Sequence, residues 1–326
     1  MRVPRPSQPS LERALAVARS KRLRLALSLC LGLLGLAAAA LTVRHFVTNG
    51  WPLAHADPFL VVAAGALFVG AYAAKAFGWK RLFARDVRPS APALAAATGA
   101  ATVTGVALPG RFDDVVRITV VRRFHTSKAG FGAICLSIVL VGFLDSAALT
   151  PLASVAAGLT DLSAWPRAGL ALVAFAGVAA AAIVVAMPRL AHSRRLARFR
   201  IVRWLEAHSA GTREAAKAWT FIAGSWGLRA VALYVLFLAL GLKASFVLAL
   251  LFLCASAASA ALPVAPAGQA TQAGAGAAVL ALAGVSASSA VAFAIAAQGL
   301  IVLTGAVVVL LASAWEGRGR LVAIAR

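Results

Sequence analysis

The chain has 326 residues, of which 62% are hydrophobic and 13% are charged, and its mean hydropathy is +0.89. These values exclude an ordinary soluble domain and predict an all-α protein that crosses a membrane several times. The net charge of +22 does not indicate nucleic-acid binding, because the basic residues form short runs beside apolar stretches, as in the cytoplasmic loops of membrane proteins.

Residues 1–22 form a basic segment in which Glu12 is the single acidic residue. An apolar run from Leu25 to Val43 follows, and a run of about 20 residues is long enough to cross a bilayer. This run is too long for the core of a cleaved secretory signal, so we expect a membrane anchor with a cytoplasmic N-terminus. We expect residues 23–315 to form one transmembrane domain and residues 316–326 to form a short basic cytoplasmic tail.

The order of apolar and basic segments predicts the remaining topology. Basic residues are concentrated after residue 79, in the loop 189–217 and at the C-terminus, whereas the loop 47–58 has no Lys or Arg. The positive-inside rule therefore places both termini in the cytoplasm of a cell-membrane protein with about 7 to 8 transmembrane helices. The expected spans after the first one cover residues 59–79, 130–158, 168–187, 218–240, 244–262 and 286–312.

Two apolar stretches contain helix-breaking residues. Residues 90–108 are small and apolar with basic clusters on both sides, so a full crossing would violate the positive-inside rule and we expect a broken or re-entrant segment. A second broken segment is expected near 263–276. Paired interruptions in two halves of a chain are typical of transporter binding sites, although two unrelated proline kinks are the alternative. The expected breaking residues are Pro109 and Gly110 in the first segment and Pro263, Pro266 and Gly268 in the second, with Gln269 and Gln272 as polar lining.

Charged residues occur where the bilayer disfavours them. Arg111, Asp113, Asp114 and Arg117 directly follow the first break, and the spacings of three and four place both aspartates within reach of Arg117 on a helix. The alternative to a functional site is a loop beside the membrane with a surface ion pair.

Lys75, Asp145 and Arg229 lie inside predicted spans, where a charge costs about 2.5 to 3.5 kcal/mol on insertion scales. We expect Arg229 to join Arg111 and Arg117 in binding a phosphate, with the three aspartates as their charge partners. The alternative is a set of internal salt bridges that only fixes helix packing. Lys75 is near the end of its span, and we expect its side chain to extend to the interface.

The sequence lacks the motifs of common catalytic sites. No Gly-Lys dipeptide occurs, which excludes a phosphate-binding loop, and the histidines are scattered without metal-ligand spacing. We therefore expect no enzymatic activity, no cofactor and no metal.

Two segments resemble the lysylphosphatidylglycerol synthase transmembrane, or flippase-like, family. The run ALPGRFDDVVRITVVRR is similar to the family segment L-P-G-R-x-G-E-x-x-R, with Asp114 in place of the glutamate. The run from Ala261 to Leu300 is similar to the second family signature, L-P-x-x-P-G-G-x-G-x-x-E. There Ala273 replaces the glutamate, and Gln269 and Gln272 are the nearby polar residues.

The resemblance implies a membrane domain related to the lipid-translocating half of the multiple peptide resistance factor, without the soluble synthase domain. It favours a flippase-like protein that binds an anionic phospholipid or lipid-linked phosphate in a polar intramembrane cavity and moves it between leaflets. A second hypothesis is a non-transporting membrane partner that binds a polyprenyl phosphate or phospholipid for an associated glycosyltransferase or synthase. A third, a lipid-modifying membrane enzyme, requires a nucleophile or an acid and base that the sequence does not supply.

Overall fold

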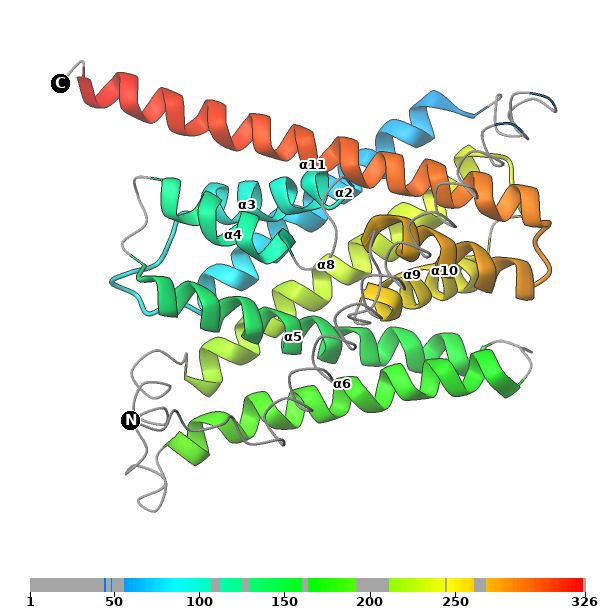
Figure 1. Cartoon of the computed structure of the whole chain (residues 1–326), viewed down its shortest axis with the longest axis horizontal. Coiled ribbons are helices and arrows are strands. Elements are labelled where there is room, and N and C mark those ends of the chain that lie inside the picture. Colours follow the sequence, from blue (N-terminus) through cyan, green and yellow to red (C-terminus); the bar gives the residue numbers. More distant parts are fainter. Residues whose placement is uncertain are drawn as a thin grey trace, which may run out of the picture. The chain divides into compact units, whose positions relative to one another are not determined.

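The computed structural model describes residues 56–106, 112–124, 129–159, 164–191, 211–243, 245–260 and 268–324, together with Arg44 and Thr48. The chain divides into two units, Met1–Pro52 and Leu53–Arg326, and the description below concerns the second. Its described residues form nine helices, which confirms the predicted all-α class (Figure 1). They are α2 (Pro58–Arg81), α3 (Ala91–Thr104), α4 (Phe112–Arg123), α5 (Phe131–Gly158), α6 (Ala164–Ala191), α8 (Thr212–Ala239), α9 (Phe246–Ala260), α10 (Gly268–Leu282) and α11 (Ala287–Ile324).

Five of the described helices are long and apolar enough to cross a membrane, namely α2, α5, α6, α8 and α11. They match five of the predicted spans, and the span predicted over 25–43 lies outside the described residues. The full crossing expected over 244–262 differs from the structure. Helix α9 has 15 residues and is therefore about 22 Å long, which is shorter than the hydrocarbon core of about 30 Å.

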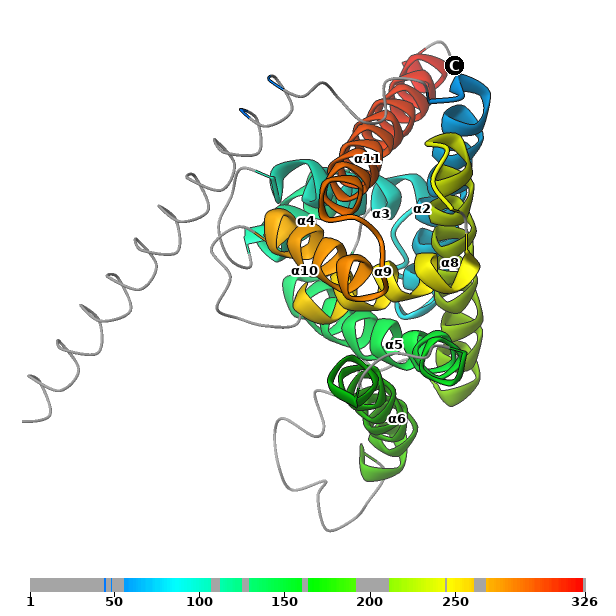
Figure 2. The ribbon, with the colours of Figure 1, turned by 90° about the vertical axis from the view of Figure 1, so that its right-hand side faces the viewer.

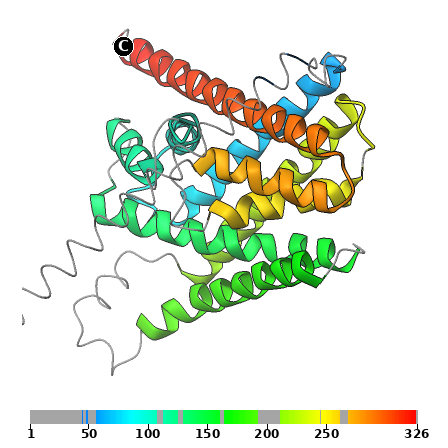
Figure 3. The ribbon, with the colours of Figure 1, turned by 45° about the vertical axis from the view of Figure 1, so that its right-hand side comes forward.

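The short helices form two packed pairs, α3 with α4 and α9 with α10. Ser90 accepts a hydrogen bond from the amide of Ala93 and starts α3, and Gly105 ends it after 14 residues. Ala93, Leu94, Ala97 and other residues of α3 are buried against protein, as expected for a segment that does not face lipid. In Figures 1 and 3, the α3–α4 pair and the α9–α10 pair lie toward opposite ends of the second unit.

Helices α2 and α8 pack as an antiparallel pair. At one end the amide of Asp57 donates to the carbonyl of Ala239 over 2.8 Å. At the other end, Gly78 allows close approach, because a Cβ there would lie 2.9 Å from the carbonyl oxygen of Ala218. Glu214 adds ion pairs to Arg88 at 2.9 Å and to Arg81 at 3.5 Å. These contacts fix which residues of the two helices face each other.

The remaining long helices surround this pair. Helix α5 packs against α8, and α11 packs against α2 and α3. Helix α6 packs on α5 at the outside of the unit, as Figure 2 shows. A Cβ at Gly177 would collide with Thr150 and with the carbonyl of Ser146, so glycine is needed for the close approach of α6 to α5. The arrangement leaves α2, α5 and α8 in mutual contact around the charged residues of the spans.

Candidate intramembrane polar site

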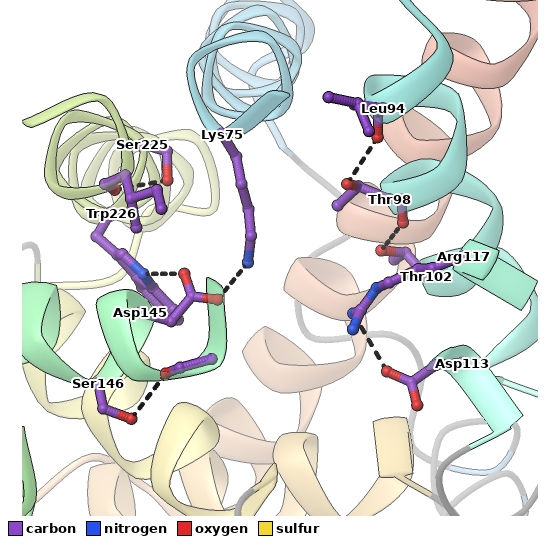
Figure 4. Close-up of polar contacts among 12 residues, drawn as sticks. Lys75, Leu94, Thr98, Thr102, Asp113, Arg117, Asp145, Ser146, Ser225 and Trp226 are labelled. Atoms are coloured by element: carbon purple, nitrogen blue, oxygen red, sulfur yellow. Dashed lines mark hydrogen bonds and ion pairs between the residues drawn. The ribbon is translucent and has the colours of Figure 1, made fainter. Parts of the chain in front are cut away.

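Lys75 and Asp145 form an ion pair inside the bundle. The Lys75 Nζ atom lies 2.7 Å from Oδ2 of Asp145, and Lys75 is only 8% exposed. Our expectation that Lys75 extends to the interface is therefore wrong, because a carboxylate on α5 compensates its charge where the side chain is buried. Figure 4 shows the lysine of α2 pointing at this carboxylate.

Both oxygens of Asp145 have a donor. Besides the contact with Lys75, the indole Nε1 of Trp226 donates to Oδ1 of Asp145 over 2.9 Å. We expected Asp145 to be a charge partner of the arginines, and in the structure it forms its ion pair with Lys75. Helices α2, α5 and α8 are thus joined by one partly buried network. Such networks are stabilising only when each polar group has its partner, and this carboxylate does.

Arg229 lies against two aromatic rings. Its Cζ atom is 5.0 Å from the centroid of the Trp226 ring and 5.8 Å from the centroid of the Tyr72 ring. Both distances fall within the range of cation–π attraction. No carboxylate of the described residues forms an ion pair with Arg229. The guanidinium is therefore held by aromatic faces, which leave its N–H donors available to an anion.

Arg117 has two acidic neighbours on its own helix. Its guanidinium lies 2.7 Å from Oδ1 of Asp114 and 3.2 Å from Oδ2 of Asp113. The sequence spacing predicted both contacts, and α4 brings them about because residues three and four apart share a face. About a third of each side chain is exposed, so these pairs are worth only about 0.2 to 1 kcal/mol each.

The cations lie close enough together to influence one another. The positive charges of Arg229 and Arg117 both act on Lys75 and on Tyr72. In Figure 4, Arg117 lies across from Lys75 and Asp145. Of these cations, Arg229 lies against the Tyr72 ring. Arg111, Pro109 and Gly110 lie outside the described residues, so their positions relative to this group stay predictions.

Tyr72, Trp226 and Thr102 were not among the site residues predicted from the sequence. The hydroxyl of Tyr72 lies 3.1 Å from Oγ1 of Thr102 and 3.2 Å from the carbonyl oxygen of Ile301, which links α2 to α3 and α11. A signal was present, because Tyr72 and Trp226 each precede a cation by three residues and so share a helix face with it.

The second broken segment reaches the end of α3. Gly268 is the first residue of α10, and the side-chain nitrogen of Gln269 would lie 3.4 Å from a Cβ at Gly105. The side-chain oxygen of Gln269, Oε1, is buried without a hydrogen-bond partner among the described residues. The backbone carbonyl of Gln272 accepts a bond from Ser256 on α9. Pro263 and Pro266 lie outside the described residues.

The described residues contain no group of His, Cys, Asp and Glu that could hold a metal ion. In the comparison with protein families, the model described as "Lysylphosphatidylglycerol synthase TM region" matches residues 14–312. The curated proteins and the solved structures gave no match. The family model spans the helices that carry Lys75, Arg117, Asp145 and Arg229.

Proposed function

Because the chain belongs to the family of the lysylphosphatidylglycerol synthase transmembrane region, we propose that it binds an anionic lipid head group inside the bundle and moves the lipid between leaflets. The family relation makes it a membrane protein concerned with lipids. The polar site suggests the chemistry of the ligand, which is a phosphate that carries a net negative charge.

Arg229 carries this proposal. A guanidinium within a membrane span is costly unless an anion or polar group compensates it. Asp145 is already bonded to Lys75 and Trp226, and the aromatic rings beside Arg229 offer attraction but accept no strong hydrogen bond. A lipid phosphate would supply the missing anion and can accept two parallel N–H bonds from the planar guanidinium.

Transport is supported by the arrangement of the short helices. Helices α3 and α9 are too short to cross the bilayer alone, and in the sequence each is followed within five residues by a proline, Pro109 or Pro263. Interrupted helices in both halves of a membrane protein are typical of transporters whose substrate binds near the midplane. We propose that Arg117 and Arg111, which follow the first interruption, contact the head group as it enters from the cytoplasmic side.

The test uses protein reconstituted into phosphatidylcholine vesicles that contain fluorescent phosphatidylglycerol in both leaflets. A membrane-impermeant reductant bleaches only the outer leaflet, so exchange between leaflets increases the bleached fraction. We expect the natural chain to increase it and Arg229→Met to abolish the increase. Arg122→Met removes the same charge from an exposed position of α4 and should behave like the natural chain.

Unchanged exchange in folded Arg229→Met protein would remove this residue from the site. Binding of phosphatidylglycerol without any exchange by the natural chain would refute transport and favour the role of a lipid-binding partner for another membrane enzyme.

A further inference from the structure

The second unit contains two sets of helices in the same order. Helices α2, α3, α4 and α5 are long, short, short and long, and so are α8, α9, α10 and α11. Each helix of the second set begins 154 to 156 residues after the helix in the same place of the first set. The paired first residues are Pro58 and Thr212, Ala91 and Phe246, Phe112 and Gly268, and Phe131 and Ala287. The sequence Ala-Leu-Pro recurs at the same spacing, ending at Pro109 and at Pro263.

The packing repeats as well as the order. The contact of α2 with α3 corresponds to that of α8 with α9, and the contact of α5 with α8 corresponds to that of α11 with α2. The contacts of α3 with α11 and of α9 with α5 are likewise equivalent. Each of these eight helices therefore has a counterpart with equivalent contacts inside the repeat, which identifies an internal repeat, and α6 lies outside it.

The two halves run in opposite directions. Helices α2 and α8 are antiparallel, and in Figure 1 α5 and α11 also run in opposite directions. Asp57 faces Ala239 at one end of the pair, and Gly78 faces Ala218 at the other. Either contact, extended along the two antiparallel helices, places Ala71 opposite Ser225. Both are fully buried at 0% exposure, and they are themselves equivalent positions of the repeat. A pseudo-twofold axis in the membrane plane therefore passes between them.

The residues beside this axis match in chemistry. Tyr72 and Trp226 are equivalent aromatic residues, and Lys75 and Arg229 are equivalent cations. The aromatic side chains also bond to equivalent positions. Tyr72 contacts the carbonyl of Ile301 on α11, and Trp226 donates to Asp145 on α5. Asp145 and Ile301 correspond at the spacing of α5 and α11.

One charge breaks the symmetry. Lys75 has the carboxylate of Asp145 beside it, whereas the position equivalent to Asp145 in the other half is Ile301, which has an apolar side chain. The two cations at the axis thus differ in one respect, since Lys75 is neutralised within the protein and Arg229 is not neutralised by any described carboxylate.

We propose that Lys75 and Arg229 are the two equivalent ligands of one lipid phosphate on the pseudo-twofold axis, and that the phosphate displaces Asp145 from Lys75 when it binds. This inference rests on the proposed function and names a further binding residue and its internal competitor. The positive charge of Arg229 acts on Lys75, so an anion between them relieves their repulsion. Asp145 keeps the indole donor of Trp226 after Lys75 has left it.

The binding test uses the full chain in detergent, with short-chain phosphatidylglycerol as the anionic probe and short-chain phosphatidylcholine as the zwitterionic one. Asp145→Asn removes the competitor, and we expect it to tighten phosphatidylglycerol binding about tenfold, the scale of one charge-assisted hydrogen bond. The double variant Lys75→Met with Asp145→Asn removes the ligand as well and should bind at least about tenfold more weakly than Asp145→Asn alone.

A second test uses the symmetry itself. Ile301→Asp places a carboxylate where the repeat predicts it will neutralise Arg229, so phosphatidylglycerol binding should weaken about tenfold. Ile301→Asn has nearly the same shape without the charge and should bind like the natural chain. This pair keeps the inference testable if Asp145→Asn does not fold.

Equal phosphatidylglycerol affinity in Asp145→Asn and in the double variant would overturn the role of Lys75. Equal affinity in the two Ile301 variants would overturn the symmetric arrangement of the two cations about the phosphate. If Arg229→Met abolishes phosphatidylglycerol binding while either of these results is found, the proposed function stands without this inference. If the natural chain binds both probes equally, the proposed function fails and the inference fails with it.

Discussion

Gly78 offers a direct test of the close packing between α2 and α8 on which the site depends. A Cβ at this position would lie 2.8 Å from Cγ1 of Ile222 and 2.9 Å from the carbonyl oxygen of Ala218. The isoleucine can change rotamer, but the carbonyl belongs to the backbone of α8, so Gly78→Ala must push the two helices apart.

The magnitude follows from two opposing effects. Overpacking costs about 1 to 3 kcal/mol, and replacing a helical glycine by alanine returns at most about 1 kcal/mol of helix propensity. We expect Gly78→Ala to destabilise the folded protein by about 1 to 2 kcal/mol. Adding Ile222→Ala opens space on one side only. It should not restore stability, because the carbonyl of Ala218 stays in place and a buried side chain is lost.

Reversible unfolding in mixed micelles, followed by circular dichroism, measures these differences in the free energy of unfolding. Gly65→Ala is the matched control on the same helix, because its Cβ would meet only side-chain atoms at 3.6 and 3.7 Å. It should be neutral or slightly stabilising. Equal stability of Gly78→Ala and Gly65→Ala would show that a Cβ at residue 78 does not push α2 and α8 apart.

Three further predictions concern the charges. Lys75→Met alone should cost about 3 kcal/mol of unfolding free energy, because it leaves the largely buried carboxylate of Asp145 with the indole donor of Trp226 but without a cation. Adding Asp145→Asn should recover most of this loss, and equal stability of the single and double variants would contradict a stabilising ion pair. Arg117→Lys should weaken phosphatidylglycerol binding several-fold in a titration despite the retained charge, since the planar fork is lost, and an unchanged affinity would place Arg117 outside the site. A cysteine in the loop 189–217 should react with an impermeant reagent only from the cytoplasmic side and one at Lys243 only from the other, and the opposite pattern would overturn the proposed topology.

The fold class and the order of long helices followed from hydropathy and charge, because a span needs about 20 apolar residues and its ends carry a basic bias. The length of α9 did not follow. Residues 244–262 are apolar enough for a full crossing, whereas the described helix α9 has 15 residues and packs against α10 and α8. Hydropathy measures preference for hydrocarbon and cannot distinguish a helix in lipid from one buried in protein.

Local spacing predicted the charge pairs within one helix but not those between helices. The contacts of Arg117 with Asp113 and Asp114 required only the period of α4. The pair of Lys75 with Asp145 joins positions 70 residues apart, and it depends on how α2 and α5 pack. The partner of Asp145 therefore did not follow from its spacing to the cations in the sequence. The 154-residue repeat lay in the sequence, but weakly similar apolar helices conceal such a period until their contacts are known.

Helix α11 has 38 residues and is therefore about 57 Å long, well beyond the hydrocarbon thickness of about 30 Å. It approaches α3 closely at Gly305, whose carbonyl oxygen would lie 2.5 Å from a Cβ at Gly99. If α11 tilts as a rigid rod, this contact would be the point about which it turns. A small tilt of α11 beside Tyr72 becomes a larger displacement at its far end. A spin label at the exposed Trp315 would therefore report a tilt of α11 as a displacement larger than the one at the centre of the bundle.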